Sequence, residues 1–190
     1  MSTSKMKEKN TKKLPPHLGG HFNVTHVDLN AIQYIKDKYQ IKTSYDLGCG
    51  PGGMIKAMSS IGIKSTGIDG DFTLPNCNEI ILHDFAIGPL KNPIKADLCW
   101  STEFLEHVEE KYMDNYFSVF KVCKYAFCTA SENPNGYHHV NLQNTQYWIK
   151  RFKERGFLFL PDDTEQIRKK SSMKRDFVRD AGMFFRRELS

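Results

Sequence analysis

The sequence predicts one doubly wound α/β domain, and three observations support this prediction. Short apolar runs alternate with segments whose apolar residues recur at helical spacing, as in a parallel sheet with helical crossovers. A glycine-rich turn joins the first apolar run to a helical segment. The chain has 190 residues, which is close to the size of one domain. Any substrate site must therefore be built from the loops of a single core.

The basic excess lies at the two ends of the chain. Residues 1–13 carry five Lys against one Glu, and residues 150–190 carry twelve basic and seven acidic residues. Residues 14–149 carry ten basic and fourteen acidic residues, so the middle of the chain is acidic. We expect residues 1–13 to be a flexible Lys-rich tail and residues 14–190 to form the single domain.

The composition argues against a membrane or an exported protein. Hydrophobic residues make up 39% of the chain, enough for a globular core, but no apolar run approaches the roughly 20 residues that cross a bilayer. The five cysteines are widely spaced and include no C-x-x-C pair, which favours reduced thiols. A cytoplasmic protein without a membrane partner is expected.

The elements follow in order from a loop-like leader segment, defined here as residues 14–27, which contains Pro, Gly and three His. Asp28 is a predicted N-cap for a helix over residues 29–39. The stretch from Gly70 to Asn78 is too short for a regular crossover helix. Strands are expected at residues 44–47, 65–68, 79–83, 97–100, 125–129, 157–160 and 183–186, and further helices at 54–61, 111–123, 145–155 and 164–170.

The glycine-rich turn indicates an adenosine-type cofactor. Gly48, Gly50 and Gly53 lie between a predicted strand and a predicted helix, where glycines allow a sharp turn and a close approach to a ligand. Asp69 ends the next strand, where a carboxylate can accept hydrogen bonds from both hydroxyls of a ribose. The glycines also satisfy a dinucleotide pattern, but a carboxylate at Asp46 would repel a pyrophosphate and favour a cationic ligand.

Four short motifs carry a resemblance to class I S-adenosylmethionine-dependent methyltransferases. Asp46-Leu47-Gly48-Cys49-Gly50-Pro51-Gly52 resembles their first motif, and Gly67-Ile68-Asp69 resembles the acid of their second strand. His83-Asp84-Phe85 is similar to their adenine-contacting motif, and Asp97-Leu98-Cys99-Trp100-Ser101 to their fourth strand. The resemblance spans residues 43–187, and the order of the motifs supports it more than any one of them.

This resemblance implies a Rossmann-like, seven-stranded, mostly parallel sheet with helices on both faces and one antiparallel strand near the C-terminus. It also implies S-adenosylmethionine bound across the carboxyl ends of the first two strands. Phe72 is expected in the adenine wall. The expected cofactor-binding residues are Asp46, Gly48, Cys49, Gly50, Gly53, Asp69, Gly70, Asp84, Phe85 and Ser101.

Acceptor chemistry is expected on loops at the same edge of the sheet. His138 and His139 follow the fifth strand, and an imidazole can take up a proton near neutral pH, with His139 the preferred residue. Glu106 and His107 follow the fourth strand and could orient a histidine or simply lie at a helix start. The Glu103-x-x-Glu106-His107 run lacks the second His of a zinc-protease helix, so no metal is expected.

We therefore expect O-methylation of a small molecule or glycan. Residues 168–175 are rich in Lys and Arg, and this pattern has two interpretations: a site for an anionic group of the acceptor, or, more simply, a solvated basic face. One alternative is a nucleic-acid methyltransferase, which the two basic ends favour and the acidic middle opposes. The other is a protein that binds the cofactor without transferring a methyl group.

Overall fold

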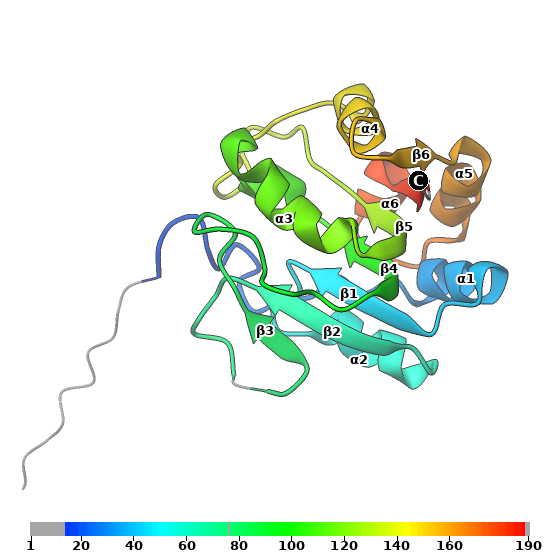
Figure 1. The fold of residues 1–190 in the computed structure, drawn as a ribbon, viewed down its shortest axis with the longest axis horizontal. Helices are drawn as coiled ribbons and strands as arrows, with labels where there is room; N and C mark the ends of the chain where they lie inside the picture. The colour runs from blue at the N-terminus through cyan, green and yellow to red at the C-terminus, as the bar shows by residue number, and fades with distance from the viewer. Residues whose placement is uncertain (1–13, 76, 189–190) are drawn as a thin grey trace, which may run out of the picture.

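A seven-stranded sheet forms the centre of the protein in this computed structural model, which describes residues 14–75 and 77–188 (Figure 1). The strand order is β3-β2-β1-β4-β5-β7-β6. The predicted Lys-rich tail, residues 1–13, lies outside the described residues. The strands are β1 (Thr43–Leu47), β2 (Lys64–Asp69), β3 (Ile80–Leu82), β4 (Ala96–Ser101), β5 (Cys123–Cys128), β6 (Phe157–Phe159) and β7 (Met183–Arg187).

Helices cover both faces of this sheet (Figure 1). Residues of α3 and α4 pack in one apolar cluster, and residues of α1, α2, α5 and α6 pack in a second one. The helices are α1 (Leu29–Tyr39), α2 (Gly53–Ser60), α3 (Met113–Phe120), α4 (Thr145–Lys153), α5 (Pro161–Lys170) and α6 (Phe177–Ala181), with 3-10 turns at Leu105–His107 (η1) and Glu110–Tyr112 (η2).

The sheet is parallel except at its C-terminal strand. β7 inserts between β5 and β6 and runs antiparallel to both. The predicted doubly wound fold, with one antiparallel strand near the C-terminus, is therefore confirmed. Because β1, β2 and β4 are parallel neighbours, their carboxyl ends meet at one edge, and the order of strands reverses between β1 and β4. Ligands bind at such switch points in open α/β sheets.

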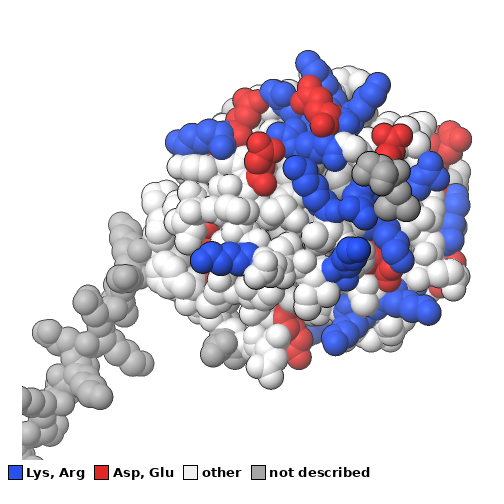
Figure 2. Space-filling model, viewed as in Figure 1, with Lys and Arg blue, Asp and Glu red and all other residues white. Residues whose placement is uncertain are grey.

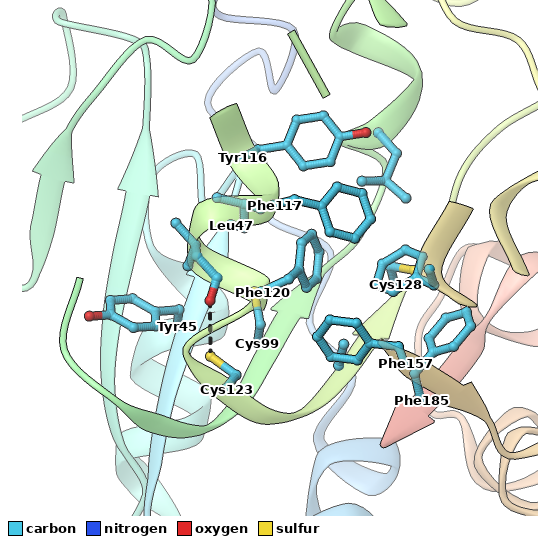
Figure 3. Packing of buried hydrophobic residues seen from close by; sticks show 14 of the residues in the cluster. Tyr45, Leu47, Cys99, Tyr116, Phe117, Phe120, Cys123, Cys128, Phe157 and Phe185 are labelled. Carbon is cyan, nitrogen blue, oxygen red and sulfur yellow. Dashed lines mark hydrogen bonds between the residues drawn. The ribbon is translucent and has the colours of Figure 1, made fainter. Parts of the chain in front are cut away.

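Aromatic side chains fill the layer between the sheet and α3. Phe152 of α4 stacks on Phe185 of β7 with ring centroids 4.2 Å apart, and it also contacts Phe117 and Phe120. Figure 3 shows the rings of α3 facing Phe157 and Phe185 across this layer. Stacked and edge-to-face pairs add to the free energy of apolar burial. This aromatic layer holds α3 and α4 against the sheet.

Asp28 caps α1 as the sequence predicts. Its carboxylate accepts a hydrogen bond from the Ala31 N–H at 3.1 Å and is fully buried. It also accepts from the Ser172 N–H at 2.8 Å and from the Ser171 hydroxyl. One buried carboxylate thus joins the start of α1 to the segment that follows α5.

Three predictions need correction. The helix expected at residues 111–123 is α3 only from Met113 to Phe120, because Cys123 already belongs to β5. The start of α5 was placed three residues late, since Pro161 occupies its first turn, where a missing N–H costs nothing. The short helix α6 was not predicted. In the part of the chain that the structure describes, no helix is long and apolar enough to cross a bilayer.

The basic residues of 168–175 do not form one cluster. Arg168 donates to the Gly182 carbonyl at 2.9 Å, and Lys169 pairs with Glu165 one turn earlier on α5. Arg175 is exposed. Figure 2 shows Lys and Arg gathered where Figure 1 places α4, α5 and α1, whereas the surface next to the leader segment is mostly uncharged on this face. Of the expected anion site at residues 168–175, Arg175 lines a cavity at the carboxyl ends of the strands, described below.

Candidate functional site

Two adjoining cavities lie at the carboxyl ends of β1, β2 and β4. The first, about 250 Å³, lies over the end of β2, and the second, about 400 Å³, lies over the glycine loop. We call them the β2 cavity and the loop cavity. Both are lined by residues of the leader segment, the glycine loop and the segments after β4 and β5, and they share Gly20, His21, Gly48, Glu103, His107 and Tyr137.

The glycine loop uses its own amides within the protein. The N–H groups of Gly48 and Cys49 both donate to the Ile68 carbonyl, and that of Gly52 donates to the Cys49 carbonyl. The N–H of Gly50 donates to Asp69, and that of Gly53 to the Thr25 hydroxyl. Since Pro51 has no N–H, all the amides of this loop are engaged. The loop offers no row of free donors to a pyrophosphate, in contrast to a phosphate-binding loop.

Three glycines of the loop are closely packed against side chains from other segments of the protein. A Cβ atom at Gly48 would lie 2.7 Å from the ring of Phe104, and one at Gly53 would lie 2.7 Å from Thr25. A Cβ at Gly50 would lie 3.0 Å from His21. Gly48 and Gly50 also have positive φ values of 75° and 48°, which favour glycine. Packing and backbone conformation thus account for glycines that sequence reasoning assigned to a ligand.

Asp69 joins the end of β2 to the glycine loop. One carboxylate oxygen accepts from the Gly50 N–H at 2.8 Å, and the other accepts from the Asp71 N–H at 2.9 Å. Each oxygen keeps a further lone pair, because a carboxylate has about four acceptor sites. Asp69 lines the β2 cavity, where it can accept bonds from two vicinal hydroxyls.

Asp46 is buried at the end of β1 and lines the loop cavity. Its Oδ2 atom is buried and has no hydrogen-bond partner among the described residues. Burial, with a contribution from the charge of Asp69, raises the pKa of Asp46 to about 8. Without a cation beside it, this carboxyl therefore holds its proton at neutral pH, unlike the carboxylate that the sequence suggested. A cationic ligand in the cavity would favour the ionised form.

The leader segment contributes to the lining of both cavities. His17 Nε2 lies 2.9 Å from Asp84 Oδ2, and His21 Nε2 lies 3.0 Å from Asp71 Oδ2. The side chain of Leu18 contacts Gly70, where a Cβ would lie 2.4 Å away. The leader thus covers the end of β2 and the glycine loop.

The far wall of the β2 cavity contains three of the expected adenine-side residues. Gly70, Asp84 and Phe85 line it. Phe85 is buried and contacts the ring of Phe104 edge-on at 6.1 Å between centroids. Phe72, expected in this wall, is 44% exposed and lies outside the lining, although Gly70 of the same segment lines the cavity.

Two other expected cofactor contacts lie outside both linings. Ser101 is fully buried, and its hydroxyl donates to the Leu47 carbonyl at 3.0 Å, which ties β4 to β1. Gly53 begins α2 and lies against Thr25. Both positions follow a sequence motif, but tertiary contacts use them within the protein. Cys49, also expected to bind the cofactor, does line the loop cavity.

The residues expected to act on the acceptor come from the segments that follow β4 and β5, and the fold brings these segments together. Glu103, His107 and His139 line the loop cavity, whereas His138 lines the β2 cavity. The rings of His107 and His139 lie 4.8 Å apart between centroids. Burial, together with His139 and His138, lowers the pKa of His107 to about 4, so its imidazole is neutral at physiological pH.

Glu106 lies behind these histidines and outside both linings. It is fully buried, and burial together with the charge of Glu103 raises its pKa well above the usual value. Burial also raises the pKa of Glu103, although a hydrogen bond with Thr129 opposes this. Sequence reasoning named Glu103 together with Glu106 and His107 after the fourth strand, but it gave an orienting role to Glu106 and no site role to Glu103. Glu103 also has a positive φ of 52°, which is uncommon outside glycine.

Solved structures with the same fold include S-adenosylmethionine-dependent methyltransferases. One, from Clostridium acetobutylicum, superposes with a TM-score of 0.62 at 10% identity over 85% of this chain and 91% of its own. The plantazolicin methyltransferase BpumL, in complex with SAH and a monoazolic desmethylPZN analog, gives a TM-score of 0.57 at 12% identity over 85% and 82%. The methyltransferase domain of bacterial CtHen1 gives 0.53 at 16% identity over 85% and 97%.

Sequence comparisons give no further assignment. No family model matches the sequence, and no curated protein matches it either. The identities to the solved structures are low, so the likeness establishes the fold.

Proposed function

Starting from the class I methyltransferase fold, we propose that this protein is an S-adenosylmethionine-dependent methyltransferase that acts on an oxygen of a small molecule or glycan. One observation carries the proposal. Asp69, the glycine loop and the partnerless Asp46 carboxyl line adjoining cavities at the switch point of the sheet. These groups match the hydroxyls and the positive charge of an adenosyl sulfonium ligand.

The residues present fit this cofactor. Asp69 would accept the two ribose hydroxyls, and Gly70, Asp84 and Phe85 would enclose the adenine in the β2 cavity. Asp46 would face the cationic end from the loop cavity, together with Cys49 and Gly50. The engaged loop amides disfavour a dinucleotide, because its pyrophosphate would find no free donors there.

The cofactor supplies an activated methyl group on a sulfonium, which an oxygen lone pair attacks as the carbon–sulfur bond breaks. The chain has to hold the acceptor oxygen in line with that bond and take up its proton. Glu103, His107 and His139 line the loop cavity, so they are the groups that would meet the acceptor. Cavities of about 250 and 400 Å³ suit a cofactor and a small acceptor or the end of a glycan.

Replacing Asp69 with Asn tests the cofactor site. The substitution keeps the size of the side chain but removes the charge that strengthens hydrogen bonds from ribose hydroxyls. It also replaces one oxygen that accepts from a backbone N–H with an NH2 donor, so the melting temperature of the variant is measured beside its affinity. Two such bonds, at about 1.5–3 kcal/mol each, correspond to a loss of affinity of about 100-fold or more. Isothermal titration calorimetry with S-adenosylmethionine and S-adenosylhomocysteine measures this change directly.

Asp37→Asn is the matched control. Asp37 is exposed on α1, where it accepts from Gln33, away from both cavities. This variant should bind both ligands as the unmodified protein does. Equal affinity in the Asp69→Asn variant would refute the ribose role. Formation of S-adenosylhomocysteine with candidate hydroxyl acceptors then separates a transferase from a protein that only binds the cofactor.

A further inference from the structure

Three potential metal ligands converge beside the loop cavity. One side-chain ligand atom from each of Glu106, His107 and His139 lies within 4.8 Å of the other two. Two ligands of one transition-metal ion lie at most about 4.2 Å apart, because each bond measures about 2.1 Å. Small rotations of the side chains would therefore close the three atoms around an ion.

Glu106 presents an unused ligand atom to this cluster. Its Oε1 accepts from the Ser131 N–H at 3.1 Å, which fixes the carboxylate. Its Oε2 is buried and lacks a hydrogen-bond partner in residues 14–75 and 77–188. A buried carboxylate oxygen without a partner is costly, since nothing replaces the water that it lost on folding. A cation in the cluster would satisfy it.

His139 is oriented as metal-binding histidines usually are. Its Nδ1 lies 2.6 Å from the Asn133 carbonyl oxygen, to which it must donate, because a carbonyl can only accept. The lone pair of the neutral ring then lies on Nε2. A hydrogen bond from one ring nitrogen to a backbone carbonyl fixes the tautomer that leaves the other nitrogen free for a metal.

The loop that carries His139 is tied to the turn that carries Glu106 and His107. The N–H groups of Val140 and Asn141 both donate to the Glu106 carbonyl, at 2.9 and 3.0 Å. The buried Asn141 side chain donates to the Val108 carbonyl at 3.3 Å. These bonds hold ligands from two separate segments in one place, so the cluster is a built arrangement.

We propose that Glu106, His107 and His139 bind a divalent transition-metal ion. Two imidazole nitrogens and one carboxylate oxygen suit ions such as Mn²⁺, Fe²⁺, Co²⁺ or Zn²⁺ better than Ca²⁺. Such a set of three leaves positions open for other ligands. His107 and His139 line the loop cavity, and Glu103 lines it beside them as a potential fourth ligand.

This site extends the proposed function and depends on it for its role. An ion at the edge of the loop cavity would bind the acceptor hydroxyl through an open position and lower its pKa, so that the oxygen becomes a better nucleophile. The sequence argued against a metal because η1 lacks a second histidine. The structure supplies that histidine from the loop after β5.

Titration of the chelator-treated full chain with Mn²⁺ tests the site. We expect one ion per chain, detected by calorimetry and by loss of the free Mn²⁺ signal in electron paramagnetic resonance. Glu106→Gln keeps an acceptor for the Ser131 N–H but removes the charge, and it should weaken binding at least tenfold. His139→Ala should do the same. Glu132→Gln removes an exposed carboxylate on the same loop, outside the lining of both cavities, so it is the matched control and should bind as the unmodified protein does.

The outcomes are distinct. Absence of one-to-one binding up to millimolar Mn²⁺ and Zn²⁺ would overturn the metal site, as would equal affinity in a Glu106→Gln variant whose melting temperature is unchanged. S-adenosylmethionine binding, measured in the presence of the chelator, reports on the proposed function separately. If the cofactor binds and the ion does not, only the metal site fails. If neither binds, both proposals fail.

Discussion

Asp46 is the residue whose ionisation should report ligand binding most directly. Its pKa of about 8 follows from burial and from the nearby charge of Asp69, so the carboxyl is protonated in the free protein at neutral pH. A cation bound beside it stabilises the ionised form and lowers this pKa. Binding of a sulfonium ligand should therefore release a proton.

The release should depend on pH with a defined sign. Near pH 7 we expect a release approaching one proton per ligand, falling to about half a proton at pH 8, the pKa of Asp46, and vanishing well above it because Asp46 is then already ionised. Calorimetry in buffers that differ in ionisation enthalpy measures the protons released. Asp46→Asn should bind without this release. If that variant releases as many protons as the unmodified protein, Asp46 is not their source.

Among the elements, the leader segment is the one whose position the sequence predicts least, and the structure places it against both cavities. Its Pro and Gly residues predict a loop, but neither they nor its three histidines predict where this loop lies on the domain. The path depends on contacts with distant residues, such as the pairs of His17 with Asp84 and of His21 with Asp71. The hydrophobic periodicity of α1 and the strands, in contrast, is a local signal, and their bounds were predicted to within about two residues.

Because the leader lines both cavities and lies against Gly50 and Gly70, it should slow the departure of a bound cofactor. His21→Ala removes the contact with Asp71 and the ring over Gly50. We expect the dissociation rate of S-adenosylhomocysteine to rise about tenfold in this variant, which corresponds to about 1.4 kcal/mol, in the range of one hydrogen bond with a charged group. Stopped-flow fluorescence with a competing ligand measures the rate.

The control for this experiment is Asn23→Gly, because glycine accepts the positive φ of 58° at this position. Asn23 belongs to the same leader but is exposed, and its side chain lies outside the lining of both cavities. Its dissociation rate should match that of the unmodified protein. A His21→Ala variant that releases the ligand no faster would show that the leader does not retain it.

On the scale of the whole molecule, the place of the basic side chains bears on whether the acceptor is a nucleic acid, and Arg175 is a basic residue that lines the loop cavity. On the face drawn in Figure 2, basic side chains gather over α4, α5 and α1 and not beside the leader segment. A nucleic-acid acceptor would need basic residues next to the cavities, because phosphate contacts supply most of the affinity. Several of the basic residues are also paired within the protein, including Arg151 with Glu110 and Arg155 with Asp114.

Oligonucleotide binding should therefore be weak. We expect a Kd no tighter than about 10 μM at 150 mM salt, in the range of non-specific association. Fluorescence anisotropy at 50 and 200 mM salt measures it, with the full chain and with a variant that lacks residues 1–13. Tight binding that survives this deletion and competes with S-adenosylhomocysteine would favour the nucleic-acid alternative.

The sequence by itself determined the alternation of strands and helices, the glycine turn and the acid at the end of β2, because each depends on neighbouring residues in the chain. Only the tertiary structure decided which motif residues face a cavity. Ser101 and Gly53 fit the motif but serve the packing of strands and leader. His139 meets Glu106 and His107 because β4 and β5 are adjacent parallel strands, whose following segments emerge at the same edge of the sheet.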